Sequence, residues 1–278
     1  MPPRGRRLRL GGRSVRVIDE GAGPPVVLIH GLGGQAENFA ALTPHLAGFR
    51  RLSIDRAGAG RSAAAPPGAE ALPAQAARIA AVMEAAATGP AVVVGHSLGG
   101  AVALQLAADR PDLVRGLVLC GALTQPDFPR LSRFGARLGS VPALREGVAH
   151  LLGVPALGLV SPWLLWLCFT PDPMPPGFLR WGGGMLVGQP RAIAGVLRDA
   201  RVVAEGIGAL QPRLGRIGHP AVILHGTGDR VLPAAHARHA AAALPRAELR
   251  LIPGGHMLPV CHPAAVARAV REVARAAD

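Results

Sequence analysis

The chain contains no lysine and no tyrosine, and it has few aromatic residues and few cysteines. All 30 basic residues among its 278 are arginine, and aromatic residues make up only 3%. Half of the residues are apolar, so a large core is possible, but it must be built from alanine, valine and leucine. Three cysteines, Cys120, Cys168 and Cys261, are too few and too scattered for a disulfide framework or a zinc site. We therefore expect small buried thiols and no metal.

Basic residues outnumber acidic ones, and the formal net charge is +13. The arginines are spread along the chain apart from a cluster in residues 1–16, and no nucleic-acid-binding module accompanies them. Together with abundant alanine, glycine and proline, this composition is typical of a GC-rich genome. We expect no nucleic-acid partner and at most a weak attraction to anionic surfaces.

No apolar stretch follows the arginine-rich N-terminus, so no secretory signal is predicted and the expected location is the cytoplasm. Residues 151–169 carry no charge and approach the length of a membrane span. Pro155 and Pro162 interrupt this stretch. We interpret it as helices lining an apolar pocket, with contact at a membrane surface as the alternative.

Residues 91–107 join a β-branched apolar strand to a helix without a connecting loop. The junction reads Gly95-His96-Ser97-Leu98-Gly99, a Gly-x-Ser-x-Gly pattern that is typical of a nucleophile elbow when it lies between strand and helix. Larger residues at positions 95 and 99 would collide with neighbouring backbone. The pattern therefore predicts a strained turn that holds the Ser97 hydroxyl above the sheet.

A serine nucleophile needs a base and a carboxylate that orients the base. Asp229 follows a predicted buried strand over residues 220–226, and His256 follows another over residues 248–252. The order Ser97, Asp229, His256 differs from the orders in chymotrypsin and subtilisin. Asp229 could instead cap a turn or helix, His256 could be an ordinary loop histidine, and Asp127 is the rival acid.

With two further motifs, the chain resembles the α/β-hydrolase superfamily over nearly its whole length. Residues 30–34 look like the family's oxyanion loop, and residues 55–62 look like its D-x-x-G-x-G-x-S loop. The resemblance implies an α/β fold with a mostly parallel eight-stranded sheet and helices on both faces. It implies a core of residues 1–122 and 211–278, and a helical cap of residues 123–210 inserted after the sixth strand. It also implies hydrolytic or related acyl-transfer chemistry without a cofactor.

In this chemistry Ser97 attacks an acyl carbonyl, His256 transfers its proton, and Asp229 orients the imidazole. The backbone N–H groups of Leu32 and Leu98 are the expected oxyanion donors. Five residues are interpreted as supports of the elbow and the oxyanion loop: His30, Gly31, Gly95, His96 and Gly99.

Trp163, Trp166 and Met257 are candidates for the substrate pocket, with packing inside the cap as the alternative for the tryptophans. His262 is interpreted as structural. The turn formed by Asp55, Gly58, Gly60 and Ser62 is interpreted in the same way.

Serine at the elbow disfavours the dehalogenases and epoxide hydrolases of this fold, which use aspartate there. We predict a carboxylesterase- or lipase-like enzyme that acts on a small ester of apolar character. The alternatives are a C–C bond hydrolase of vinylogous diketones, a thioesterase or lactonase with the same triad, or a non-catalytic ligand receptor.

The apolar and polar patterning also predicts the order of elements. Predicted strands cover residues 8–10, 15–18, 26–29, 51–54, 91–94, 116–120, 220–226 and 248–252, and predicted helices cover residues 36–46, 73–87, 98–108, 234–243 and 263–276.

Overall fold

The computed structural model describes residues 5–64, 66, 71–126, 154–183, 195–196, 199 and 206–277, without the side chains of residues 154–161. Its centre is one eight-stranded sheet of order β1-β2-β4-β3-β5-β6-β7-β8. β2 runs antiparallel to both of its neighbours, and all other neighbouring pairs are parallel. The predicted mostly parallel eight-stranded sheet is therefore confirmed. The strands are β1 (Arg6–Leu10), β2 (Arg13–Glu20), β3 (Pro25–Ile29), β4 (Arg50–Ile54), β5 (Ala91–His96), β6 (Val114–Cys120), β7 (Ala221–Gly226) and β8 (Ala247–Ile252).

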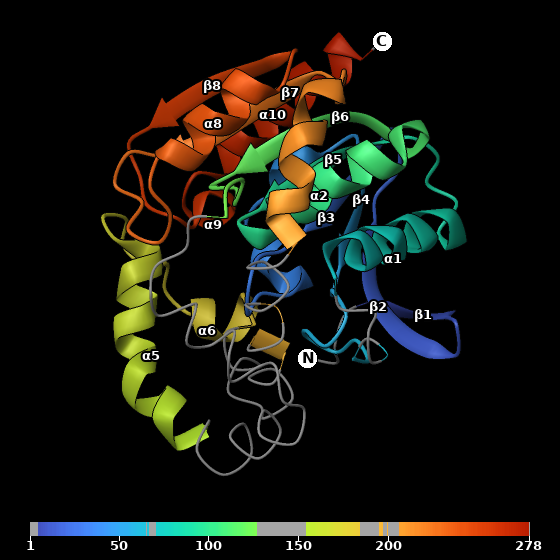
Figure 1. Ribbon diagram of the computed structural model, residues 1–278. Coiled ribbons are helices and arrows are strands. Elements are labelled where there is room, and N and C mark those ends of the chain that lie inside the picture. The colour runs from blue at the N-terminus through green and yellow to red at the C-terminus, as the bar shows by residue number, and fades with distance from the viewer. Residues whose placement is uncertain are drawn as a thin grey trace.

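Helices cover both faces of the sheet (Figure 1). Successive side chains of a strand point to opposite faces, so Val27 and Ile29 of β3 belong to one core cluster and Val26 and Leu28 to the other. The first cluster includes residues of α1 (Leu72–Ala85), α2 (Leu98–Asp109) and α8 (Ala235–Ala243). The second includes residues of α10 (Pro263–Ala276). Burial on both faces explains why the inner strands read as continuous apolar runs.

The single helix predicted over residues 36–46 is not present. The chain forms two short 3₁₀ helices there, η1 (Ala36–Phe39) and η2 (Thr43–Leu46). Pro44 supplies no N–H and restricts the residue before it, so one α-helix cannot run through this stretch. Phe39, Leu42 and Leu46 still bury their side chains in the second cluster.

The segment between β6 and β7 contains α5 (Val154–Phe169) and α6 (Phe178–Trp181), which lie together below the sheet in Figure 1. Phe169, Phe178 and Val260 form a separate small apolar cluster that joins this segment to the residues after β8. Ile207 and Leu210 belong to the first core cluster. The predicted limits of a cap at residues 123 and 210 remain a prediction, and the rival acid Asp127 lies outside the described residues.

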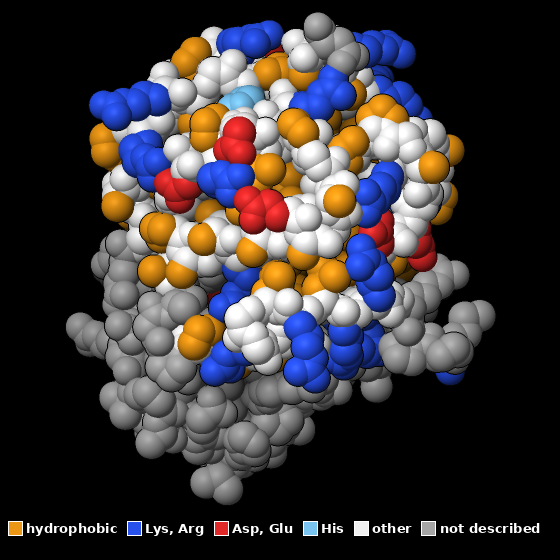
Figure 2. Space-filling model, turned by 90° about the vertical axis from the view of Figure 1, so that its right-hand side faces the viewer, with side chains coloured by type: hydrophobic (Ala, Val, Ile, Leu, Met, Phe, Trp, Pro, Cys, Tyr) orange, Lys and Arg blue, Asp and Glu red, His pale blue; other side chains and the backbone are white. Residues whose placement is uncertain are grey.

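Among the described residues, no helix is both long enough and apolar enough to cross a bilayer. Figure 2 shows one face of the molecule, on which arginines are spread among apolar and acidic side chains. Several arginines are ion-paired, among them Arg50 with Asp19 and Arg110 with Glu84 and Asp112. The expectation that nucleic acid does not bind remains a prediction.

Candidate active site

Ser97 occupies the turn between β5 and α2, and its backbone is strained. Its φ of 55° and ψ of −122° lie in a region that residues with a side chain rarely adopt. A Cβ atom on Gly99 would lie 2.1 Å from the Ile29 carbonyl oxygen, and one on Gly95 would lie 2.6 Å from the Cα of Gly100. Both positions therefore require glycine, as the sequence pattern predicts.

His256 and Asp229 form a buried pair on the loops after β8 and β7. His256 Nδ1 lies 2.7 Å from Asp229 Oδ2. The other carboxylate oxygen, Oδ1, accepts hydrogen bonds from the N–H groups of Val231 at 2.8 Å and Leu232 at 2.9 Å. Asp229 thus also makes the turn contacts that were its alternative interpretation, but with the oxygen that faces away from His256.

Burial on its own would raise the pKa of Asp229. The hydrogen bond and charge interaction with His256, together with the two backbone N–H donors, outweigh burial and lower the pKa of this carboxyl. Asp229 is therefore an anion at neutral pH, and it stabilises a proton on His256 Nδ1.

The loop after β3 lies directly against Ser97. A Cβ atom on Gly31 would lie 2.8 Å from the Ser97 Cβ and 3.3 Å from its hydroxyl oxygen. In the part of the chain that the structure describes, the backbone N–H groups of Leu32 and Leu98 donate to no other residue. Leu98 begins α2, so its N–H also lies at the positive end of the helix dipole.

No hydrogen bond links Ser97 to His256 among the described residues. The two residues are nevertheless connected through His96, whose ring lies 4.8 Å from the His256 ring, measured between centroids. Such nucleophile–base hydrogen bonds are often long in free enzymes and tighten when substrate binds.

His96 braces the loop of His256. Its Nε2–H donates to the His256 carbonyl oxygen at 3.0 Å. Burial, followed by the neighbouring charge of His256, lowers the pKa of His96 to about 3. His96 is therefore neutral at every pH at which the protein would be assayed, and it holds the loop through a fixed tautomer.

His30 supports the oxyanion loop in a similar way. Its Nε2 accepts the backbone N–H of Arg56 at 3.0 Å, and its Nδ1–H lies 2.8 Å from the Gly31 carbonyl oxygen. Burial and the nearby Arg56 guanidinium lower the pKa of His30 well below its ordinary value. A neutral ring is what one accepting and one donating nitrogen require.

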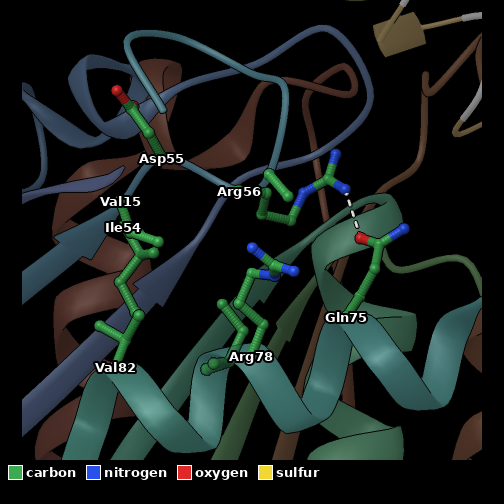
Figure 3. A pocket seen from close by; sticks show the side chains of 9 residues that line it. Val15, Ile54, Asp55, Arg56, Gln75, Arg78 and Val82 are labelled. Carbon is green, nitrogen blue, oxygen red and sulfur yellow. Dashed lines mark hydrogen bonds between the residues drawn. The ribbon is translucent and has the colours of Figure 1, made fainter. Parts of the chain in front are cut away.

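Arg56, which was not predicted as a site residue, is buried under the oxyanion loop. Its guanidinium donates to the carbonyl oxygens of His30 and Gly31 at 3.0 and 2.9 Å. It also donates to Gln75 of α1 and to Asp199, each at 2.7 Å. Figure 3 shows Arg56 reaching Gln75 beside a small pocket that Ser97 does not line. A signal was available in the sequence, because the arginine stands two positions after the end of a predicted strand.

Asp55, by contrast, supports the interpretation of its loop as a structural turn. It is buried and accepts the N–H groups of Ala36 and Arg61, each at 2.8 Å, and its partner is the buried Arg16. A Cβ atom on Gly60 would lie 2.4 Å from this carboxylate.

The sequence model of the family described as alpha/beta hydrolase fold matches residues 24–159 of this chain. The 30 kDa subunit of the magnesium chelatase of Rhodobacter capsulatus is 32% identical over 91% of this chain and 88% of its own. RutD of Variovorax paradoxus, whose name assigns it provisionally to carbamate hydrolysis, is 31% identical over 84% of this chain and 85% of its own. The chain belongs to the alpha/beta hydrolase family.

Solved structures of alpha/beta hydrolases share the fold over the whole length. The enol-lactonase of Burkholderia xenovorans superposes with a TM-score of 0.82 and 22% identity, covering 97% of this chain and all of that one. In this chain no group of three or more His, Cys, Asp or Glu side chains could hold a metal ion, as far as the residues are described.

The three candidates for the substrate pocket lie in different environments. Trp163 and Trp166 are 52% and 50% exposed on α5, and the guanidinium of Arg230 lies 5.0 Å above the Trp166 ring. Neither tryptophan is therefore a core residue of this segment, and their contact with substrate remains a prediction. Met257 is half-buried and packs against the cluster of Phe169, Phe178 and Val260.

Proposed function

We propose that this alpha/beta hydrolase is a serine hydrolase that cleaves a carboxylic ester of apolar character through an acyl-enzyme. The observation that carries the proposal is the arrangement of three loops at the carboxyl ends of the parallel strands. Ser97 sits at a strained elbow against Gly31, and the 2.7 Å pair of His256 and Asp229 is held beside it through His96.

In the proposed reaction the Ser97 hydroxyl oxygen attacks the carbonyl carbon while His256 takes its proton at Nε2. Asp229 holds Nδ1–H, which selects the tautomer with a free Nε2 and stabilises the imidazolium that forms. The N–H groups of Leu32 and Leu98 would donate to the oxyanion. The loss of one such donor typically costs about 3 kcal/mol of transition-state stabilisation.

The second half of the reaction reverses these roles. His256 delivers its proton to the leaving alcohol, which departs and leaves an ester of Ser97. Water then attacks this ester with His256 as base, and the acid is released with Ser97 restored.

The preference for an ester of apolar character is supported by α5, which has no charged residue over its 16 positions. It is also supported by the structural similarity to an enol-lactonase, a protein named for the cleavage of a cyclic ester. The similarity to RutD keeps a carbamate, whose carbonyl the same groups could attack, within the proposal.

The test is turnover of p-nitrophenyl esters of increasing acyl length by the wild type and by Ser97→Ala. We expect the wild type to hydrolyse them with an optimum in chain length and the variant to lose activity by about 10⁴-fold or more. Equal rates in both proteins would overturn the proposal.

The Rhodobacter capsulatus relative favours a second candidate, because its name is that of a chelatase subunit and it covers 91% of this chain. In this role the protein would bind a ligand or partner on the hydrolase scaffold without turning it over. An inert Ser97, with no ester turned over by the wild type, would favour this candidate.

A further inference from the structure

The last residues of α5 and the segment that follows it lie against both loops that carry the acid and the base of the proposed triad. A Cβ atom on Gly228, next to Asp229, would lie 2.5 Å from the Cδ of Pro171. A Cβ atom on Gly255, next to His256, would lie 2.5 Å from the Phe169 carbonyl oxygen. The backbone N–H of His256 itself donates to the Cys168 carbonyl oxygen at 3.2 Å. Residues 168–171 therefore pack against the backbone next to Asp229 and His256.

The side chain of Asp172 also contacts the loop that carries His256. Its Oδ2 accepts the backbone N–H of Gly255 at 2.7 Å, and its Oδ1 lies 3.0 Å from Nε2 of His262. Gly255 precedes His256 in the sequence and His262 follows it. One carboxylate therefore joins the two sides of the loop that carries this histidine. The Asp172 side chain is only 17% exposed. Hydrogen bonds to an ionised group are about twice as strong as neutral ones, so this contact is a strong restraint on the loop.

The loop needs such a restraint because its own sequence provides little rigidity. Pro253 is followed by two glycines, and Gly254 has a φ of 154°. Glycine loses more conformational freedom on folding than any other residue. Contacts from outside the loop must therefore hold the His256 imidazole between Asp229 and Ser97.

We propose that Asp172 is a positioning residue for His256, and that it acts through the Gly255 N–H and the His262 ring. This inference rests on the proposed function, in which His256 is the base. Asp172 touches no reacting atom, and its role is to keep the imidazole within reach of Ser97. A displacement of about 1 Å at such a group can lower the rate by about a hundredfold.

Asp172 also stands out in the sequence, although it was not predicted as a site residue. It is the one charged residue of residues 154–179. A lone carboxylate in an apolar stretch needs a hydrogen-bonding partner wherever it is buried, and here the partners belong to the histidine loop. The segment inserted after β6 thus contributes to the geometry of the proposed triad.

The test compares Asp172→Ala and Asp172→Asn with Asp19→Ala in the full-length chain. Asp19 is a matched control, because its side chain is 14% exposed and it accepts from Arg6 and Arg50 at the other edge of the sheet. We expect Asp172→Ala to lower kcat for p-nitrophenyl esters and the rate of labelling by a fluorophosphonate by about tenfold to a hundredfold, with KM within twofold of the wild type. Asp172→Asn keeps an acceptor for the Gly255 N–H and should recover most of the rate.

A second readout does not depend on turnover. The proton between His256 Nδ1 and Asp229 should give a downfield ¹H NMR resonance in the wild type and in Asp19→Ala, and it should broaden or shift in Asp172→Ala. If the wild type neither labels nor hydrolyses esters but this resonance responds, the proposed function fails and the positioning role stands. An unchanged resonance in Asp172→Ala, or equal losses of rate and melting temperature in Asp172→Ala and Asp19→Ala, would overturn the role of Asp172.

Discussion

His256 Nδ1 lies 2.7 Å from Asp229 Oδ2, and the opposite oxygen of the same carboxylate is held by the N–H groups of Val231 and Leu232. The carboxylate cannot rotate without losing two hydrogen bonds, so its orientation toward His256 is set before any substrate arrives. Such preorganisation makes an acid–base pair effective in catalysis.

This relationship predicts the effect of Asp229→Asn. An asparagine amide can donate to Nδ1 and thereby favour the tautomer with its proton on Nε2, which cannot accept a proton from Ser97. We expect kcat to fall by about 10⁴-fold in steady-state ester hydrolysis. Asp19→Asn, at the far edge of the sheet, should stay within twofold of the wild type. A loss below tenfold in Asp229→Asn would mean that another carboxylate, such as Asp127, is the acid.

A second prediction concerns Gly99→Ala. The added Cβ would lie 2.1 Å from the Ile29 carbonyl oxygen and 2.7 Å from that of His30, so β3 and the elbow must move apart. We expect the free energy of unfolding to fall by about 1–3 kcal/mol, measured by urea denaturation, with a loss of ester hydrolysis. Gly218→Ala is the control, because a Cβ there meets nothing within 4 Å. Equal stability of the two variants would contradict the close contact at the elbow.

A third prediction follows from the buried histidines. Burial lowers the pKa of His30, His96 and His225, and that of His96 falls from 6.5 to about 3. As the pH falls below 6.5 the unfolded chain binds protons that the folded chain does not, so acid favours unfolding. We expect the free energy of unfolding to decrease steadily between pH 7 and pH 5.

His96→Gln isolates one of these contributions, because the glutamine amide can still donate to the His256 carbonyl oxygen. Between pH 7 and pH 5, the free energy of unfolding should decrease by about 2 kcal/mol less in this variant than in the wild type. Denaturant titration at each pH measures this difference. Parallel pH dependences in the two proteins would show that His96 does not stay neutral on folding.

A fourth prediction concerns Arg56→Lys. A single ammonium group cannot replace a planar guanidinium that donates to His30, Gly31, Gln75 and Asp199 at once. We expect the oxyanion loop to lose its support and kcat/KM for esters to fall by about tenfold or more. Arg61→Lys, in the same loop but 28% exposed, should change kcat/KM by less than twofold. Similar effects of the two changes would contradict a special role of Arg56.

Much of the fold was predictable because the signals were local. The apolar strands, the predicted helix over residues 263–276 and the glycines of the elbow depend on short-range periodicity and close contact, which a sequence shows directly. The helix predicted over residues 36–46 is absent because Pro44 does not allow one α-helix to run through this stretch, and the chain forms two short 3₁₀ helices instead.

The supporting residues of the site were harder to predict. Arg56 and Asp172 act through partners that are 19 to 143 positions away in the sequence. Arg56 stands at an unspecified position of the D-x-x-G-x-G-x-S loop, and Asp172 belongs to no motif that the sequence shows. Only the folded chain brings Asp172 to Gly255 or Asp199 to Arg56. The exposure of side chains was equally hard to predict, because Trp163 and Trp166 lie in an apolar run and are nevertheless half exposed.

The central claim is that Ser97 is an activated nucleophile, and its most direct test is covalent labelling by a fluorophosphonate, followed by intact mass and peptide mapping. The account predicts one adduct per chain, located on Ser97, in the wild type. It predicts no adduct in Ser97→Ala and much slower labelling in Asp229→Asn. An unlabelled wild type, or an adduct that persists in Ser97→Ala, would contradict the claim.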